Sequence, residues 1–186
     1  MALLGRPPVP TAIAAEQADA IGEPRIAVCA SIRLVNELMN SDRFKPAQTE
    51  ERNRLQAEIV PIVDQGVALE TRLKDIDPSS QEGQEIQHEL MRLRQELARK
   101  QQETGIRFEQ FISEQSREAY ALVRDSAIAI AEKRGFNYVL ASQNLDDTIT
   151  EGPVAGVLND ILGRPVLMAP EGADITEEVR ADLKLD

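Results

Sequence analysis

Two long stretches of helical periodicity, separated by a short turn, constrain this chain more than any other feature of its sequence. The first runs from about Pro46 to Ile76, and its apolar residues recur at intervals of three and four, which places them on one helical stripe. The second runs from about Gln81 to Arg134. At 1.5 Å per residue these helices would be roughly 46 and 80 Å long. They must therefore lie antiparallel, as a hairpin that projects from the rest of the protein or pairs with other chains.

Residues with strong local preferences mark the interruptions in this pattern. Pro61 and Gly66 predict a kink in the first helix, because both break helical regularity. Either Asp77, or Ser79 with Glu82 three residues later, would cap the second helix. The turn between the two helices is therefore the predicted tip of the hairpin.

Short apolar runs on either side of the hairpin predict a small sheet. A short helix over Ile32–Met39 follows the first run, and a capping box at Asp174 and Glu177 predicts a last helix ending at Leu183. A further small amphipathic helix is expected near Val154–Leu162. The three predicted strands are Arg25–Ala30, Phe136–Ala141 and Pro165–Ala169.

Together these elements predict an α+β protein in which a coiled-coil hairpin projects from a small β body. The expected organisation is a disordered leader or targeting remnant, a first part of the body, the hairpin with its tip near 75–81, and a second part of the body. The last part contains an inserted loop, 142–164, and the C-terminal helix. The corresponding ranges are 1–23, 24–45, 46–118 and 119–186.

Composition excludes several kinds of chemistry. The net charge of −11 argues against nucleic-acid binding, which needs Lys and Arg to neutralise phosphates. The single cysteine, Cys29, is expected to be buried and inert, and the single histidine, His88, lacks the second histidine of a zinc-protease motif. No catalytic, metal or cofactor-binding residues are predicted, so the chain is not expected to be an enzyme.

The N-terminal residues do not decide the cellular compartment of the protein. Ala12 and Ala14 resemble a signal-peptidase site, but prolines replace the continuous apolar stretch that such a signal needs. No run of residues approaches the roughly 20 apolar positions of a membrane-spanning helix. A periplasmic or envelope location is expected from the resemblance described next, with the cytoplasm as the alternative.

The order of elements and several short motifs resemble the Skp/OmpH family of periplasmic chaperones for outer-membrane proteins. The likeness spans about residues 25 to 186, and the order of the motifs around a central hairpin makes it fairly specific. The matching stretches are Arg25–Ala30, Leu34–Leu38, Arg134–Leu140, Val166–Ala169 and Ala173–Val179. Members of that family are strongly basic, whereas this chain is acidic, and the loop 142–164 is an insertion.

The resemblance implies a homotrimer whose strands build a β body and whose hairpins surround a cavity. Unfolded outer-membrane proteins would be held there without ATP. This predicts a holdase chaperone whose partners are unfolded clients and copies of itself. Two alternatives remain: a structural coiled-coil scaffold or tether, and a cytosolic prefoldin-like chaperone.

Such a chaperone needs exposed apolar side chains rather than reactive groups. The alternative for each residue is that it only packs the two helices of the hairpin against each other. Residues near the kink, from Ile59 to Val67, are the better client-binding candidates. The client-binding candidates are Ile59, Ile62, Val63, Val67, Leu69, Leu73, Leu90, Leu93, Leu97, Phe108 and Phe111.

The predicted strands supply candidates for a trimer core, because a three-stranded sheet from one chain would leave open edges. The alternative is an ordinary core within one chain. The trimer-core candidates are Ile26, Val28, Tyr138, Val139, Leu140, Val166, Leu167 and Met168.

A basic cluster on the long helix raises the question of lipid binding. Arg92, Arg94, Arg99 and Lys100 could contact lipopolysaccharide or phospholipid headgroups. Glutamates are interspersed at helical spacing, which favours a solvated face with internal ion pairs instead.

Overall fold

The computed structural model describes residues 23–143, 149 and 151–185. It confirms the predicted fold class in its coarse form: a mostly helical α+β chain with one very long helix and a small parallel sheet. The predicted leader, 1–23, lies almost wholly outside the described residues. The described helices are α2 (Ser31–Met39), α3 (Lys45–Ala57), α4 (Val60–Lys74), α5 (Gln81–Lys133), α6 (Val154–Leu162) and α7 (Thr176–Asp182).

The chain divides into two compact units, each described here by itself. The helical unit comprises Arg33–Val123 together with Leu185. The sheet unit comprises the residues up to Ile32 and Arg124–Lys184.

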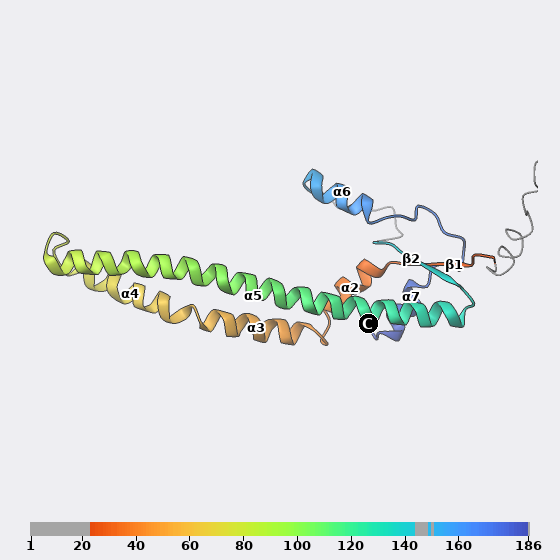
Figure 1. The fold of residues 1–186 in the computed structure, drawn as a ribbon, viewed down its shortest axis with the longest axis horizontal. Coiled ribbons are helices and arrows are strands. Elements are labelled where there is room, and N and C mark those ends of the chain that lie inside the picture. Colours follow the sequence, from red (N-terminus) through yellow and green to blue (C-terminus); the bar gives the residue numbers. More distant parts are fainter. Residues whose placement is uncertain (1–22, 144–148, 150, 186) are drawn as a thin grey trace, which may run out of the picture. The chain divides into compact units, whose positions relative to one another are not determined.

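In the helical unit, α3 and α4 lie alongside α5 (Figure 1). Ion pairs join Glu58 to Arg107, Glu70 to Arg94 and Arg72 to Glu82. From Glu58 to Glu70 to Arg72 the residue numbers rise, whereas those of their partners on α5 fall from 107 to 94 to 82. The paired segments therefore run in opposite directions.

The interruption between α3 and α4 falls at Glu58 and Ile59, slightly before the predicted kink. Pro61 stands in the first turn of α4, where its missing N–H costs no helical hydrogen bond. Gly66 lies inside α4, which continues through it without a break. Pro61 favours a helix break before it because it has no N–H to donate to a carbonyl of the preceding turn. Gly66 keeps its N–H, so the hydrogen bonds of α4 remain intact.

The cap of α5 also differs from the prediction. The backbone N–H of Gly83 donates to Ser80 Oγ over 3.0 Å, so Ser80 caps the helix rather than Asp77 or Ser79. Asp77 Oδ1 instead accepts from the backbone N–H and the hydroxyl of Ser79, at 2.9 and 2.7 Å, and shapes the turn. A Cβ on Gly83 would lie 2.9 Å from Pro78 Cα, so this tight turn requires glycine.

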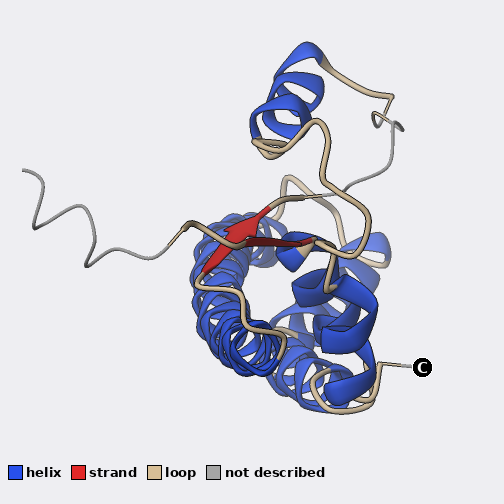
Figure 2. Ribbon diagram, turned by 90° about the vertical axis from the view of Figure 1, so that its right-hand side faces the viewer, coloured by secondary structure: helices blue, strands red, loops and turns tan. Residues whose placement is uncertain are grey.

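In the sheet unit, strands β1 (Ile26–Cys29) and β2 (Tyr138–Ala141) pair in parallel, as Figure 2 shows. Ile26 lies opposite Tyr138, and Val28 lies opposite Leu140. On its other side β1 meets residues 173–175: the Val28 N–H donates to Ala173 O over 2.8 Å, and the Ile175 N–H donates to Val28 O over 3.0 Å. β1 is therefore the central segment, and both its hydrogen-bonding edges are occupied.

The predicted strand at Pro165–Ala169 was wrong, because none of these residues is in a strand. Leu167 and Met168 are 95% and 90% exposed, and the third sheet contact is made by residues 173–175 instead. A short apolar run is compatible with a strand, but it forms one only where a partner strand can pair with its backbone. Here prolines at 165 and 170 bracket the run and cannot donate backbone hydrogen bonds.

The final helix starts at Thr176, one residue later than a cap at Asp174 predicts, and its N-cap residue, Ile175, makes no side-chain cap hydrogen bond. Asp174 Oδ1 accepts hydrogen bonds from the N–H and the hydroxyl of Thr176, at 2.9 and 2.6 Å. The Thr176 hydroxyl oxygen accepts in turn from the Ala30 N–H over 2.9 Å. Asp174 therefore ties the chain to the end of β1 instead of forming the predicted capping box with Glu177.

Candidate functional site

A shallow apolar groove of about 220 Å³ lies in the helical unit, between α4 and α5. One wall comes from α4 and the other from α5, where leucines at intervals of three and four face the same side. The structure thereby brings six of the predicted client-binding residues to one place. They are Ile62, Val63 and Val67 of α4, with Leu90, Leu93 and Leu97 of α5.

The two walls differ in how far they are covered. Leu90 and Leu93 are buried and form the floor. None of the 15 residues of α4 is buried, and Val63 and Val67 are 41% and 58% exposed. Val60, one turn earlier, is 45% exposed. The α4 wall therefore offers apolar surface to solvent instead of closing over the floor.

The other predicted client-binding residues do not line the groove. Ile59, Leu69 and Leu73 are half-buried along the same segment. Phe108 and Phe111 of α5 are also half-buried, and the Arg52 guanidinium lies 5.2 Å from the centre of the Phe108 ring. These residues contribute to packing along α5 rather than to one shared surface.

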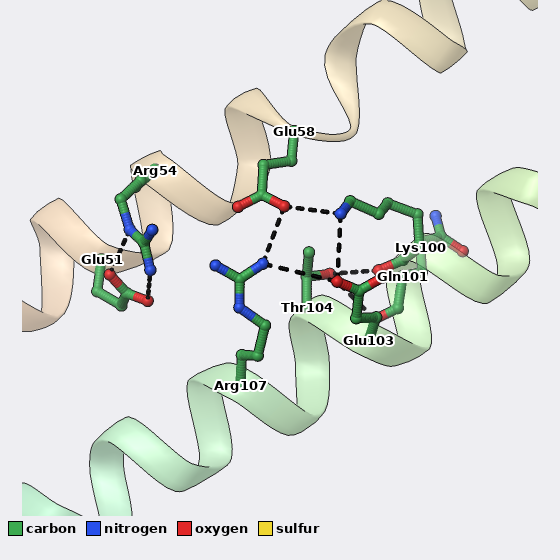
Figure 3. Close-up of polar contacts among 8 residues, drawn as sticks. All are labelled: Glu51, Arg54, Glu58, Lys100, Gln101, Glu103, Thr104 and Arg107. Atoms are coloured by element: carbon green, nitrogen blue, oxygen red, sulfur yellow. Dashed lines mark hydrogen bonds and ion pairs between the residues drawn. The ribbon is translucent and has the colours of Figure 1, made fainter.

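A cluster of charges lies immediately beside the groove, at the break between α3 and α4 (Figure 3). Glu58 Oε2 accepts from Lys100 Nζ over 2.8 Å and from Arg107 Nη1 over 2.9 Å. Glu103 Oε1 lies 3.3 Å from Lys100 Nζ and 3.8 Å from Arg107 Nη1. Two carboxylates thus neutralise two cations where the helix changes direction.

The cluster perturbs the ionisation of its central carboxyl. The hydrogen bonds from Lys100 and then from Arg107 lower the pKa of Glu58 to about 2, and Glu58 raises the pKa of Lys100. About two helical turns earlier, the hydrogen bond from Arg54 lowers the pKa of Glu51. Glu58 is therefore charged at neutral pH and holds the break against α5 by charge-assisted hydrogen bonds.

The predicted basic cluster on α5 is largely engaged with carboxylates. Arg92 pairs with Glu89, Arg94 pairs with Glu70 over 3.3 Å, and Lys100 joins the Glu58 cluster. This arrangement favours the solvated, ion-paired face over a lipid-headgroup site.

The predicted trimer-core residues fall into two groups within the sheet unit. Val28 is buried and Val139 and Val166 are half-buried, so they serve the core of the single chain at least in part. Ile26, Tyr138 and Leu140 are between 42% and 49% exposed. Because the register pairs Ile26 with Tyr138 and Val28 with Leu140, these three side chains share one face of the sheet with the buried Val28, and this face is only partly open.

Sequence reasoning missed other exposed apolar surface in the same unit. Val154, Leu158, Ile161 and Leu162 of α6 are all exposed. Leu167 and Met168, which were predicted for the trimer core, are exposed as well. The amphipathic spacing within 154–162 signalled the helix, but it could not reveal that its apolar side would remain open. The Glu58 cluster and the place of Gly66 in the groove were missed as well, since both depend on which residues face each other across the helices.

Cys29 and His88 are the remaining residues that the composition singled out. Cys29 is buried, as predicted, and His88 is exposed on α5. Within the described residues no group of three or more His, Cys, Asp or Glu side chains could hold a metal ion. In that same part of the chain, the helices are too short or too polar to cross a membrane.

Comparison with known proteins finds no family model that matches the chain and no significant match among curated proteins. The proposals below therefore depend on the chain's own residues and on the resemblance of its motifs.

Proposed function

We propose that this protein is an ATP-independent holdase chaperone of the cell envelope that holds unfolded outer-membrane or other envelope proteins. In this proposal α3, α4 and α5 form a hairpin tentacle that projects from a β body. It acts without a catalytic group or cofactor.

The observation that supports this proposal most strongly is the open groove on α4. Val63 and Val67 line it and remain 41% and 58% exposed beside a floor of buried leucines, and Val60, one turn before Val63 on the same helix, is 45% exposed. An unfolded client exposes apolar side chains, and burying them in such a groove removes apolar area from water. Nearby charges, many of them paired, keep the surface soluble without contributing a large field of one sign.

The β body supports self-association. A two-stranded parallel sheet is not stable alone, and parallel sheets normally have both faces covered. Here Ile26, Tyr138 and Leu140 leave part of one face exposed around the buried Val28. Copies of the chain would cover this face by meeting there, and three such copies would surround a space with their tentacles.

Light scattering tests the oligomer directly. A mass close to three times 20.6 kDa is expected for the full chain. Replacing Tyr138 and Leu140 with Ser should lower the mass, because both side chains belong to the exposed face. A stable monomer at all concentrations would contradict the trimer.

The holdase activity is tested by suppression of aggregation of a urea-unfolded outer-membrane β-barrel protein on dilution. The triple variant Val60→Ser, Val63→Ser and Val67→Ser should lose most of the suppression. Its helix should persist, because Ser and Val have similar helix propensities. Circular dichroism checks that persistence.

The matched control is the double variant Met91→Ser and Ile106→Ser. Both residues are exposed apolar residues of α5 and neither lines the groove. Full suppression is expected from this control. Equal activity in wild type and the valine variant would favour a structural coiled-coil tether, in which these positions affect only stability.

A further inference from the structure

Gly66 forms part of the groove wall although nothing in the packing requires a glycine there. It lines the groove with Ile62, Val63 and Val67, and it is half-buried. A Cβ built on Gly66 would meet no atom within 4 Å. Its φ is not positive, unlike those of Gly135 and Gly172. Glycine is among the least favourable residues in a helix interior. Neither a steric clash nor a special backbone conformation explains why position 66 is a glycine.

The missing side chain leaves room in the groove wall. Gly83 makes the contrast clear, since its Cβ would collide with the backbone of Pro78. At Gly66 any side chain would instead extend into unoccupied space beside Val63 and Val67. The physical consequence of glycine at this position is therefore a notch in an apolar wall.

The size and charge of the groove indicate what fits the notch. Its volume is about 220 Å³, and a cavity of about 150 Å³ already accommodates a benzene ring. The charged residues that line it, Glu70 and Arg94, neutralise each other in an ion pair of 3.3 Å. The groove thus complements an uncharged apolar group about the size of an aromatic ring.

The chain supplies no such ring nearby. No Phe, Tyr or Trp lies between Phe44 and Phe108, and the whole sequence contains no Trp. The unfolded clients proposed above do supply rings, because strands of membrane β-barrels carry girdles of aromatic residues.

We propose that the groove at Gly66 is a socket for one aromatic side chain of an unfolded polypeptide, and that Gly66 sets its specificity. This inference rests on the proposed holdase function and assigns it a substrate class: extended segments that carry Phe, Tyr or Trp.

The test uses the full chain and two dye-labelled, unstructured peptides, one with Trp at alternate positions and one with Ala in their place. Fluorescence anisotropy measures affinity for both peptides. Because the protein has no Trp, a blue shift of Trp emission reports burial of the peptide's own rings. Wild type should bind the Trp peptide at least about tenfold more tightly than the Ala peptide, a difference of about 1.4 kcal/mol.

The variants Gly66→Ala and Gly66→Leu fill the notch to different extents. Gly66→Leu should reduce binding of the Trp peptide to the level of the Ala peptide, and Gly66→Ala should have an intermediate effect. Both should raise the midpoint of thermal unfolding, by about 2–4 °C for each kcal/mol gained, because the helix becomes more favourable. A loss of binding together with a gain of stability cannot result from damage to the fold.

Gly105→Leu is the matched control. Gly105 lies in α5, would also meet no atom within 4 Å of a Cβ, and does not line the groove. It should gain stability and keep wild-type affinity. Wild-type affinity in Gly66→Leu, or equal affinity for both peptides, would overturn the socket.

The same experiment separates the socket from the function on which it rests. If wild type suppresses aggregation of the unfolded barrel but does not discriminate between the peptides, the socket is wrong and the holdase stands. If wild type neither suppresses aggregation nor binds either peptide, both proposals fall.

Discussion

Helices α3 and α4 lie along the same long helix and both are joined to it by ion pairs, yet they differ in whether they bury an apolar side chain. α3 is strongly polar, buries Leu55, and has the charge cluster of Glu58 at its end. α4 is richer in apolar residues, yet none of its residues is buried. The more hydrophobic helix is therefore the one without a fully buried residue, which is the reverse of what burial alone would produce.

The contrast teaches that an apolar face need not be a core face. Near the end of α3, Leu55 is buried and Glu58, the residue that follows the helix, forms ion pairs with Lys100 and Arg107 of α5. In α4 the valines exceed what α5 can cover, so apolar area remains at the surface. Exposed apolar surface beside charges is what binding to unfolded chains requires.

The largest expected effect compares one residue from each helix. Leu55→Ala removes a side chain that is 4% exposed and should reduce the free energy of unfolding by about 2–4 kcal/mol. Val63→Ala removes a 41% exposed side chain and gains helix propensity, so its change should stay below about 1 kcal/mol. Urea unfolding of both variants measures the difference.

Equal losses of unfolding free energy in Leu55→Ala and Val63→Ala would contradict this difference between α3 and α4. A large loss for Val63→Ala would mean that α4 is packed as tightly as α3 and that its valines belong to the core. The proposal of an open client-binding wall would then lose its main support.

A smaller effect is expected from acid, because it acts on the charge cluster at the end of α3. The lowered pKa of Glu58, about 2, means that the folded state binds its proton less readily than the unfolded chain, whose carboxyl has the ordinary value of 4.5. The stabilisation is thus fully present above pH 4.5 and is lost as pH falls toward 2. Glu51 and Asp77, whose pKa values are also lowered, add to this dependence in the same direction.

Glu58→Gln should flatten the pH dependence of the unfolding free energy between about pH 5 and pH 2. Urea titrations at several pH values measure the slope. Glu50→Gln removes one negative charge from the same helix and serves as the control for net charge. An unchanged slope in Glu58→Gln would show that the cluster does not anchor the break.

Helical periodicity was sufficient to predict most of the helices. The boundaries of α5 and α6 agree with those expected from their apolar spacing and their flanking residues, because local signals determine where a helix begins and ends. The client-binding candidates Leu90 and Leu93 were found for the same reason, since their spacing puts them on one stripe.

The sheet was harder to predict, because a strand depends on its partner rather than on its own residues. The run Arg25–Ala30 contains a strand, as predicted, and both its edges are occupied, whereas Pro165–Ala169 has a similar apolar run and no strand structure. Asp174 and Thr176 take its place through hydrogen bonds that link residues nearly 150 positions apart, as in the 2.9 Å bond from the Ala30 N–H to Thr176 Oγ1. No local pattern contains that information.

The sequence by itself determined the class of the protein: long amphipathic helices around a turn, a few short strands, an acidic surface and no reactive constellation. Only the tertiary structure decided which apolar residues are covered. Val63, Val67 and Leu93 have equivalent places in their helical patterns, but Leu93 lies beneath α4 while the valines lie at the rim. The reason is geometric: periodicity specifies the face of one helix, and exposure depends on the width and position of the helix that packs against it.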